Sequence, residues 1–417
     1  MKLLWFSHFV PFPPKGGAHQ RSFNLLRGAS KSHEVSLVAF NHLAEPNERL
    51  AEYASELKKY CEHVEFWELP VPWKSTRWWA GLAFSPLSPH PYGTRALWST
   101  ELSARWEETL RRHREAFVHF DSIDLGLYAN GTTGFRKVLN HHNCESAMAY
   151  RRARMEPNPA KKVYLWYEAK KIARLEKAVA HLFEVNTVVC ELDAQQLRRS
   201  NPKAHFHVVA NGTDVDYFRP ISLPEIPRSL IFSGSLNWYP NISAIRYFVR
   251  EIWPLIKGQY PDARLYVAGM KPSASLQQFL ESDPRVVVVA SPDDIRPWIA
   301  GATVFVCPIM DGGGTRLKIL DALAMAKPVV TTTVGCEGLQ VTHGENILIA
   351  DDPMGFARNV IHALENESLR RQLGAAGRNL VERCYSWEVI TSQLEQAYRC
   401  ALEGGACDRE PTDPIPS

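Results

Sequence analysis

The sequence predicts an α/β protein with two facing, doubly wound domains separated by a cleft. The chain has 417 residues, which exceeds what a single hydrophobic core usually covers. Apolar strand-like runs alternate with helix-like segments through the first half, as is typical of parallel sheets. The same alternation starts again after a proline-rich junction, "NGTDVDYFRPISLPEIP", at residues 211–227. A restart of this kind indicates a second domain.

The first half opens with "KLLWFSHF" at residues 2–9, which has the continuous apolar character of a strand buried on both faces. Residues 18–32 follow with apolar side chains at roughly helical spacing, and residues 33–40 return to strand character. Together they predict a strand, helix and strand unit. Further strand-like runs follow at residues 63–70, 116–122, 136–143, 182–191 and 205–212.

The second half repeats the pattern, with a strand at residues 229–236 and a helix around residues 241–260. More strand-like runs follow at residues 263–269, 285–291, 302–308, 327–333 and 346–351. We therefore expect an amino-terminal domain at 1–210 and a carboxy-terminal domain at 211–400, whose last helices can cross back to the first. Residues 401–417 have little that is apolar to bury, which predicts a flexible tail.

The net charge of +3 is distributed unevenly along the chain. Residues 1–210 contain 29 Lys and Arg against 21 Asp and Glu, a balance of +8, whereas residues 211–417 contain 19 against 24, a balance of −5. A basic half can face anionic ligands or a membrane surface, and a solvated charged face is the commoner explanation. We expect no nucleic-acid partner.

The location of the protein follows from its apolar segments. The amino-terminal apolar run is short, is interrupted by Ser7 and His8, and has no small-residue cleavage site, so a first strand is favoured over a signal peptide. No segment approaches the length that spans a bilayer. These patterns predict a cytoplasmic protein, at most peripheral at the inner face of the cytoplasmic membrane.

Residues 71–93 place Trp73, Trp78 and Trp79 among prolines and basic residues. Two interpretations remain open. The segment forms a lid or an amphipathic surface that touches a membrane or a lipid-like acceptor, because tryptophan with lysine or arginine suits the interface. Alternatively, it is an ordinary loop and helix packed on its own domain.

The strongest candidate for chemistry is the glycine run at residues 312–314. It follows the strand-like "TVFVC" and precedes a segment with helical periodicity. Glycine lets a ligand approach the backbone, and the first amides of a helix favour an anion. Arg316 and Lys318 add positive charge, so a pyrophosphate suits this turn, and Asp321 could accept hydrogen bonds from ribose hydroxyls. The alternative is a glycine-rich connection with solvated charges.

Three segments resemble the retaining glycosyltransferases of family 4: residues 307–326, "NGTDVDYFRP" at 211–220 and "PFPPKGGAHQRSFNLL" at 11–26. The likeness runs from Met1 to about Tyr398 and is closest to the sugar transferases of bacterial exopolysaccharide and capsule assembly. The resemblance implies two Rossmann-like domains of the GT-B type. It also implies a nucleoside diphosphate sugar, bound mainly by the second domain as donor substrate, and a saccharide or lipid-linked acceptor on the first. No other cofactor is expected.

The resemblance also assigns roles to residues of the second domain. Gly313, Gly314 and Thr315 would present amides, and Asp321 would hold the ribose. Many family members also have an arginine and a lysine early in the second domain that neutralise the diphosphate, but residues 232–245 supply no such pair. We expect Arg316 and Lys318 to replace them, because a departing diphosphate needs positive charge. The amides at Ser233 and Gly234 would add donors. Family members usually have two glutamates eight positions apart, and here Gly313 and Asp321 stand at those positions.

In the first domain, Gly16 and Gly17 would bring the backbone close to the donor. His141 and His142 end a strand-like run, and a histidine there could hydrogen-bond the donor sugar. We favour His142. No metal site is expected: the cysteines lack zinc-like spacing, and "DVD" at residues 214–216 suits a structural turn in the junction.

Two other functions fit the same fold. One is a sugar-nucleotide epimerase, which would need carboxylates around the donor sugar. The other is a nucleotide-binding assembly protein without catalysis, because the first motif glutamate is absent.

Overall fold

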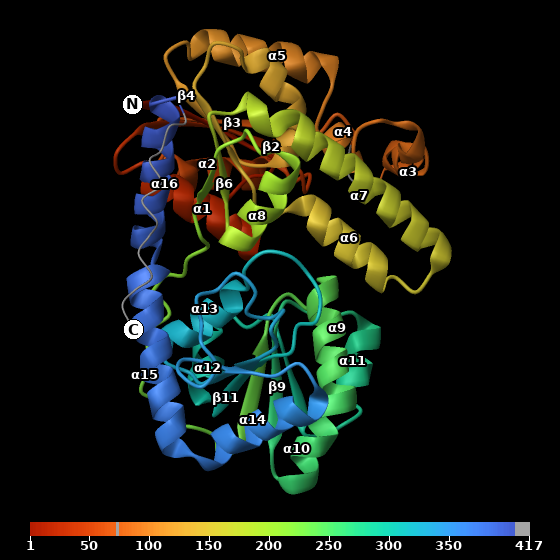
Figure 1. The fold of residues 1–417 in the computed structure, drawn as a ribbon, viewed down its shortest axis with the longest axis vertical. Coiled ribbons are helices and arrows are strands. Elements are labelled where there is room, and N and C mark those ends of the chain that lie inside the picture. The colour runs from red at the N-terminus through yellow and green to blue at the C-terminus, as the bar shows by residue number, and fades with distance from the viewer. Residues whose placement is uncertain (72–74, 405–417) are drawn as a thin grey trace. The chain divides into compact units, whose positions relative to one another are not determined.

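The computed structural model describes residues 1–71 and 75–404, and the chain divides into two compact units (Figure 1). The first unit comprises Met1–Ala210 and the chain from Thr391 onward, and the second comprises Asn211–Ile390. The helix α16 (Trp387–Leu402) runs from one unit into the other. Residues 401 and 402 of the expected tail end this helix, and the tail from residue 405 lies outside the described residues.

The first unit has a seven-stranded sheet in the order β3-β2-β1-β4-β5-β6-β7. Every neighbouring pair is parallel. The strands are β1 (Lys2–Ser7), β2 (Glu34–Asn41), β3 (His63–Glu68), β4 (Phe117–Phe120), β5 (Lys137–Asn140), β6 (Val185–Val188) and β7 (Phe206–Val208).

The helices of this unit connect the strands and cover the sheet. They are α1 (Gly17–Ala29), α2 (Asn47–Leu57), α3 (Thr76–Ala83), α4 (Tyr92–Ala96), α5 (Thr100–Arg112), α6 (Glu145–Met155), α7 (Pro159–Val179), α8 (Glu191–Ser200) and the 3₁₀ segments η1 (Ser85–Leu87), η2 (Ile123–Thr132) and η3 (Ala180–Leu182).

Alternate residues along the strands of this sheet face opposite helix layers. Leu4 and Phe6 of β1 belong to an aromatic-rich core with side chains of α5, η2 and α7. On the other face, the ring of Trp5 stacks on His119 with centroids 3.7 Å apart, and the Tyr398 hydroxyl of α16 lies 2.9 Å from Nδ1 of His119. Helices on both faces explain why the strands read as continuous apolar runs.

The second unit has a six-stranded parallel sheet in the order β10-β9-β8-β11-β12-β13. The strands are β8 (Ser229–Ser233), β9 (Arg264–Gly269), β10 (Val286–Ala290), β11 (Val304–Cys307), β12 (Val329–Thr331) and β13 (Leu348–Ile349). The helices are α9 (Tyr239–Tyr247), the π-helical η4 (Phe248–Ile252), α10 (Trp253–Gln259), α11 (Ala274–Leu280), α12 (Arg296–Gly301), α13 (Leu317–Ala324), α14 (Pro353–Glu365) and α15 (Glu367–Cys384).

The expected fold class, with two units each built on a parallel sheet, is confirmed. The expected cleft and the functions assigned to each domain stay predictions. Among the described residues, no helix has the length and apolar character needed to cross a membrane.

Two glycines in the second unit meet where β8 and β9 end. Gly234 and Gly269 both have φ near +148°, a conformation that side chains disfavour. A Cβ on Gly269 would overlap the carbonyl oxygen of Gly234. The amide of Gly234 in turn donates to the carbonyl of Ala268 over 3.0 Å. This crossing therefore depends on glycine at both positions.

We predict that Gly269→Ala lowers the free energy of unfolding by about 2–4 kcal/mol, because it adds backbone strain and steric overlap. The control is Gly258→Ala in α10, where a Cβ meets no atom within 4 Å. That change should raise stability by up to about 1 kcal/mol. Chemical denaturation measures both, and similar small effects from the two substitutions would contradict the prediction.

Candidate functional site

The candidate site of the second unit lies where the strand order reverses. β8 and β11 are neighbours in the sheet, and the chain continues from them to opposite sides, to β9 and to β12. The segments after β8 and β11 therefore separate at the carboxyl edge, and ligands of open α/β sheets bind at such points. Ser233 and Gly234 end one strand, and the glycine run follows the other.

The glycine run forms a turn directly before α13. Gly312 has φ of 118° and Gly314 has φ of 65°, and α13 begins at Leu317 without an acidic residue in its first turn. The side-chain amide of Asn211 donates to the Thr315 hydroxyl over 2.7 Å. The junction motif thus holds the turn in place. The nearby Asp311 carboxylate accepts from the Gly312 amide over 2.6 Å.

Arg316 folds back on the turn. Its NH1 donates to the carbonyl oxygen of Gly313 over 2.6 Å and also to that of Gly314. Its NH2 lies 3.4 Å from the carbonyl of Val334, and the residue is only 9% exposed. The guanidinium therefore organises the loop backbone, and its predicted contact with a diphosphate stays a prediction.

Lys318 reaches the end of β8. A Cβ on Gly234 would overlap the ammonium of Lys318, so the lysine fills the space that a side chain would occupy. The ammonium donates to Oδ1 of Asn241 over 2.6 Å and lies 4.4 Å from the centre of the Phe232 ring. Burial lowers the pKa of Lys318 to about 8. The structure thus brings the predicted residues Lys318, Ser233 and Gly234 together.

Asp321 lies one turn further along α13. Its Oδ1 accepts a hydrogen bond from the Thr213 hydroxyl over 2.6 Å. Burial raises the pKa of Asp321 to about 7. The carboxyl is therefore positioned by the junction motif, and its second oxygen can accept a ligand hydroxyl.

Sequence reasoning did not find the roles of Asn211, Thr213 and Asn241. The "NGT" of the junction is visible in the sequence, but the hydrogen bonds from it span 104 and 108 residues. No local pattern encodes such pairs. Asn241 sits in the first turn of α9 and carries no motif of its own.

The first unit has a corresponding point between β1 and β4, where the strand order also reverses. Gly16 precedes α1 with φ of 99°, and Gly17 is the first residue of that helix. Both glycines are exposed, and a Cβ on Gly16 would meet no atom within 4 Å. The first turn of α1 contains no acidic residue. This turn is therefore open to a ligand.

The structure separates the two candidate histidines. His141 is 1% exposed, its Nε2 lies 3.2 Å from Oδ1 of Asn186, and burial lowers the pKa of His141 to about 4. His142 is partly buried, and its Nε2 donates to the backbone carbonyl of Asp121 over 2.9 Å. That carbonyl can only accept a hydrogen bond, so Nε2 carries a proton. In a neutral His142, Nδ1 is then the nitrogen with the lone pair.

Asp121 is fully buried behind His142. Its Oδ1 lies 3.4 Å from Nε2 of His142 and accepts from the Asn140 amide over 2.7 Å. Arg21 in turn donates to Oδ1 of Asn140 over 2.8 Å. Burial alone would raise the pKa of Asp121, but His142 and His119 hold it well below its usual range. The Asp121 carboxyl thus favours its ionised form and orients His142.

Further imidazoles surround this point, and sequence reasoning missed them. The rings of His8, His19 and His42 form an aromatic cluster with Phe9 and His142. Burial lowers the pKa of His8 to about 3 and those of His19 and His42 to about 4. Neutral imidazoles can both donate and accept hydrogen bonds. Among the described residues, no group of His, Cys, Asp or Glu is arranged to hold a metal ion.

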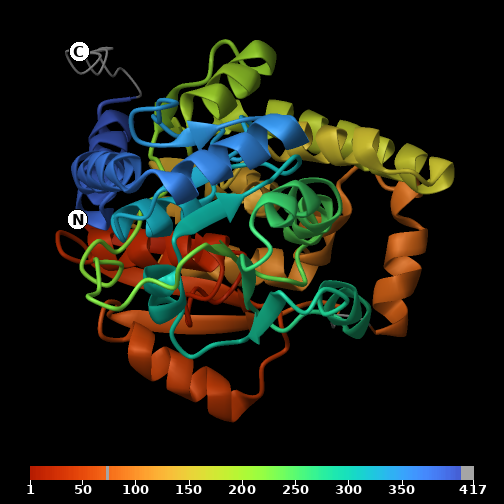
Figure 2. The ribbon, with the colours of Figure 1, turned by 90° about the horizontal axis from the view of Figure 1, so that it is seen from below.

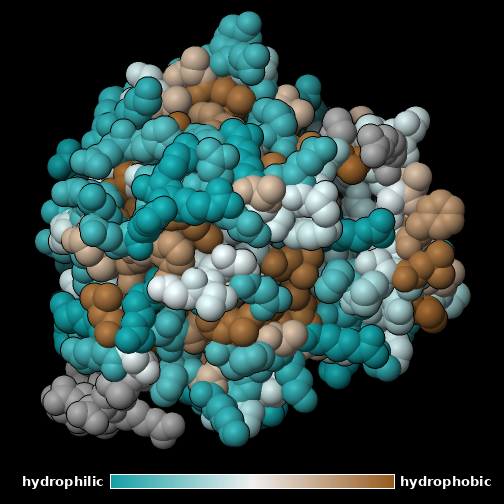
Figure 3. All heavy atoms as spheres, turned by 90° about the horizontal axis from the view of Figure 1, so that it is seen from above, coloured by the Kyte–Doolittle hydropathy of each residue, from teal (hydrophilic) through white to brown (hydrophobic). Residues whose placement is uncertain are grey.

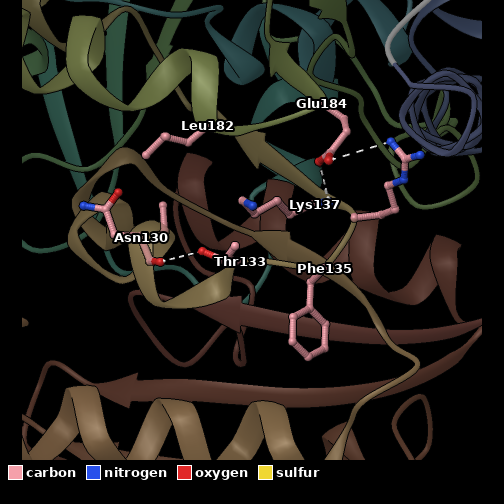
Figure 4. A pocket seen from close by; sticks show the side chains of 9 residues that line it. Asn130, Thr133, Phe135, Lys137, Leu182 and Glu184 are labelled. Atoms are coloured by element: carbon pink, nitrogen blue, oxygen red, sulfur yellow. Dashed lines mark hydrogen bonds and ion pairs between the residues drawn. The ribbon is translucent and has the colours of Figure 1, made fainter.

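A separate pocket of about 390 Å³ opens at the amino end of β5 (Figure 4). Lys137 and Glu184 line it, and the Lys137 ammonium donates to the carbonyl of Thr132 over 3.2 Å. Because β5 runs from Lys137 to Asn140, the pocket lies at the opposite end of the strand from Asn140 and Asp121. It contains none of the predicted site residues.

Comparison with known proteins independently supports the resemblance to glycosyltransferases. The family model described as "Glycosyl transferases group 1" matches residues 227–366. The capsular polysaccharide biosynthesis glycosyltransferase CapM of Staphylococcus aureus is 32% identical over 127 residues, which is 30% of this chain and 33% of CapM. The chain spans about a third to about half of the length of the curated relatives that it matches first.

Solved structures share the fold over nearly the whole chain. Sucrose-phosphate synthase from Thermosynechococcus elongatus has a TM-score of 0.73 at 17% identity, covering 97% of this chain and 100% of that one. Anabaena HepE in complex with UDP-glucose has a TM-score of 0.65 at 13% identity, covering 96% and 99%.

The family match lies on the unit that contains the glycine turn, Lys318 and Asp321, and the fold of both units agrees with these structures. Residues 227–366 thus match the group 1 glycosyltransferases, and the fold of the whole chain is that of the solved glycosyltransferase structures.

Proposed function

We propose that the protein transfers a sugar from a nucleoside diphosphate sugar to a saccharide or lipid-linked acceptor, with retention at the anomeric carbon. The proposed setting is the synthesis of a cell-surface polysaccharide in the cytoplasm. The observation that carries the proposal is the meeting of Lys318, Gly234 and the glycine turn where the strand order of the second unit reverses. The name of CapM supports the reaction class and the polysaccharide setting, and the UDP-glucose bound to HepE supports the donor class.

The second unit is proposed to hold the donor diphosphate. Amides of Gly313, Gly314 and Thr315 at the start of α13 would donate to its oxygens, and Lys318 would supply a positive charge. Arg316 would act through the loop that it organises, and would add charge near the same oxygens. Ser233 and Gly234 would contribute amides from the end of β8. The charge on these groups stabilises the diphosphate as it departs.

The first unit is proposed to receive the acceptor, with Gly16 and Gly17 giving backbone access and His142 hydrogen-bonding the donor sugar. In the reaction, the bond between the anomeric carbon and the diphosphate oxygen breaks, and the acceptor oxygen bonds to that carbon on the same face. The acceptor proton passes to the departing diphosphate oxygen. No protein nucleophile is required, and the Nδ1 of His142 would hydrogen-bond a sugar hydroxyl.

Asp321 is proposed to hold the ribose through hydroxyl hydrogen bonds. The carboxylate is one methylene shorter than the glutamate of other family members, and Thr213 fixes its position. With its pKa raised to about 7, Asp321 is incompletely ionised in the free protein at neutral pH. Hydroxyl donors favour the ionised form, so donor binding would release a proton.

Two rival functions have direct tests. An epimerase would convert the donor sugar without any acceptor, but Gly313 removes a carboxylate that this chemistry would need around the sugar. A binding protein without catalysis would show no donor turnover with lipid extracts as acceptor. If the donor is consumed only when an acceptor is present, the result supports a transferase over an epimerase and over a binding protein without catalysis.

We predict that Lys318→Ala weakens binding of nucleoside diphosphates by about 1.5–3 kcal/mol, the value of a charge-assisted hydrogen bond. Binding of the corresponding nucleosides should change little, because they lack the diphosphate. Arg316→Ala should weaken diphosphate binding to a similar extent through its loop. Isothermal titration calorimetry with uridine diphosphate and uridine measures the difference.

The matched control is Arg371→Ala, which removes one positive charge from an exposed position on α15 and should leave both affinities unchanged. Unchanged diphosphate affinity in the Arg316 and Lys318 variants would refute the assignment of these two residues.

We predict that Asp321→Asn stabilises the free protein at alkaline pH while it weakens nucleoside binding. The pKa of Asp321 rises from 3.8 to about 7 on folding, so the unfolded chain releases a proton between about pH 4 and pH 7 that the folded chain retains. Stability of the wild type therefore falls as pH rises through this window. Asparagine keeps an acceptor for Thr213 without this dependence.

Calorimetric melting at about pH 4 and about pH 8 tests this prediction. The gain in melting temperature should be present at the higher pH and absent at the lower. Asp262→Asn, an exposed acid paired with Arg228, serves as control and should show no such difference. A loss of stability in Asp321→Asn at both pH values would contradict the prediction.

A further inference from the structure

One edge of the first unit exposes large apolar side chains from two segments that are far apart in the sequence. Residues 79–87 include Trp79, Phe84 and Leu87, which are 56%, 62% and 83% exposed. The end of α6 and the first turns of α7 contribute Met155, Val163 and Trp166, which are 60%, 67% and 46% exposed. We call these six residues the apolar edge.

Specific contacts hold the two segments side by side. Ser85 of η1 donates to Oε1 of Glu168 over 2.7 Å, and the amide of Tyr92 donates to Oε2 of the same carboxylate over 3.1 Å. The buried Lys171 donates to the carbonyl of Ser85 over 3.0 Å. Both glutamate and lysine belong to α7, so α3 and η1 are tied to that helix.

The figures agree on this placement. α3 and the junction of α6 and α7 lie at the right-hand side of the first unit in Figure 1, and both remain there in Figure 2 after the turn. Figure 3 shows apolar atoms gathered at the right-hand margin, where α3 lies. Trp78 differs from Trp79: it is partly buried, and its carbonyl accepts from the Tyr92 hydroxyl over 3.2 Å. Trp73 lies outside the described residues.

The charge around the apolar edge is basic. Residues 71–100 contain no Asp or Glu, and residues 145–179 contain nine Lys and Arg against four Asp and Glu, a balance of +5. The ammonium of Lys170 lies 4.0 Å from the centre of the Trp166 ring. Lys161 and Lys162 are exposed on the first turn of α7, and Lys161 is ion-paired with Glu156 over 2.5 Å. Indole rings thus stand beside positive charges along this edge.

We propose that the apolar edge docks on an anionic lipid surface. Exposed tryptophan and aliphatic side chains insert at the boundary between headgroups and acyl chains, and neighbouring Lys and Arg are attracted to anionic headgroups. A second copy of the chain is disfavoured as occupant, because it would bring two basic edges together. The docking rests on this surface alone and stands independently of the proposed sugar transfer.

Docking of the apolar edge would bring the protein to the membrane in which a lipid-linked acceptor is embedded. The first unit, which is proposed to receive the acceptor, would then be held at the surface where a lipid-linked saccharide lies. Association with the surface raises the effective concentration of such an acceptor without any new contact at the site.

The test is co-sedimentation of the full chain with vesicles. We expect binding to phosphatidylcholine vesicles that contain phosphatidylglycerol, much weaker binding to pure phosphatidylcholine, and release by added salt. The variant Phe84→Glu with Leu87→Glu should lower the partition coefficient roughly tenfold or more, as should Lys161→Gln with Lys162→Gln. These side chains are exposed, so melting temperatures should match the wild type.

The control is Met354→Glu, which places one negative charge, against two in the Phe84 and Leu87 variant, on a methionine that is 60% exposed in the second unit. It should bind vesicles like the wild type. Equal binding by the wild type and the Phe84 and Leu87 variant would overturn the proposal, as would absence of binding to anionic vesicles. Association of the edge with another protein, without vesicle binding, would identify a protein interface instead. Donor turnover in detergent tests the transfer separately.

Discussion

The site of the second unit depends on a lysine ammonium held against a strand end that has no side chain. Lys318 occupies the space beside Gly234, and Asn241 accepts a hydrogen bond from it. A Cβ on Gly269 would overlap the carbonyl oxygen of Gly234, and both glycines have φ near +148°. The ammonium is therefore held by Asn241 beside the bare backbone at the end of β8, where it is already in place before any anion arrives.

The first unit contains a buried negative charge, the carboxylate of Asp121, beside its own candidate site. Asp121 lies below the point where β1 and β4 diverge, and its neighbours supply donors from Ser7, Asn140 and His142. Removing such a carboxylate from water is costly unless it is fully hydrogen-bonded. The Nε2 of His142 contacts both the backbone carbonyl and Oδ1 of Asp121, so Asp121 orients the histidine ring.

The parallel sheets and the glycine turn could be predicted from the sequence because both leave local patterns. Continuous apolar runs mark strands covered on both faces, and glycines between a strand and a helix mark the turn. The strand order could not be read in this way, and neither could the hydrogen bonds from Asn211 to Thr315 and from Thr213 to Asp321. Those pairs join residues that the fold alone brings together. Sequence reasoning also placed the Arg316 charge toward a ligand, whereas the guanidinium first satisfies carbonyls of its own loop.

The glycine at position 313 changes the electrostatics of the turn as well as its chemistry. A glutamate there would place a negative charge within the loop that Arg316 and Lys318 make positive, and would offer its oxygens to the sugar. With Gly313, the turn lacks that carboxylate, and Asp321 is the one acid of the 313 and 321 pair. Asp311 remains beside the turn, where its Oδ1 accepts from the Gly312 amide over 2.6 Å. The field at the start of α13 is therefore more positive, which strengthens attraction for a diphosphate. Under the proposed function, Gly313 offers no carboxylate to the donor sugar, so recognition of that sugar would depend on other groups.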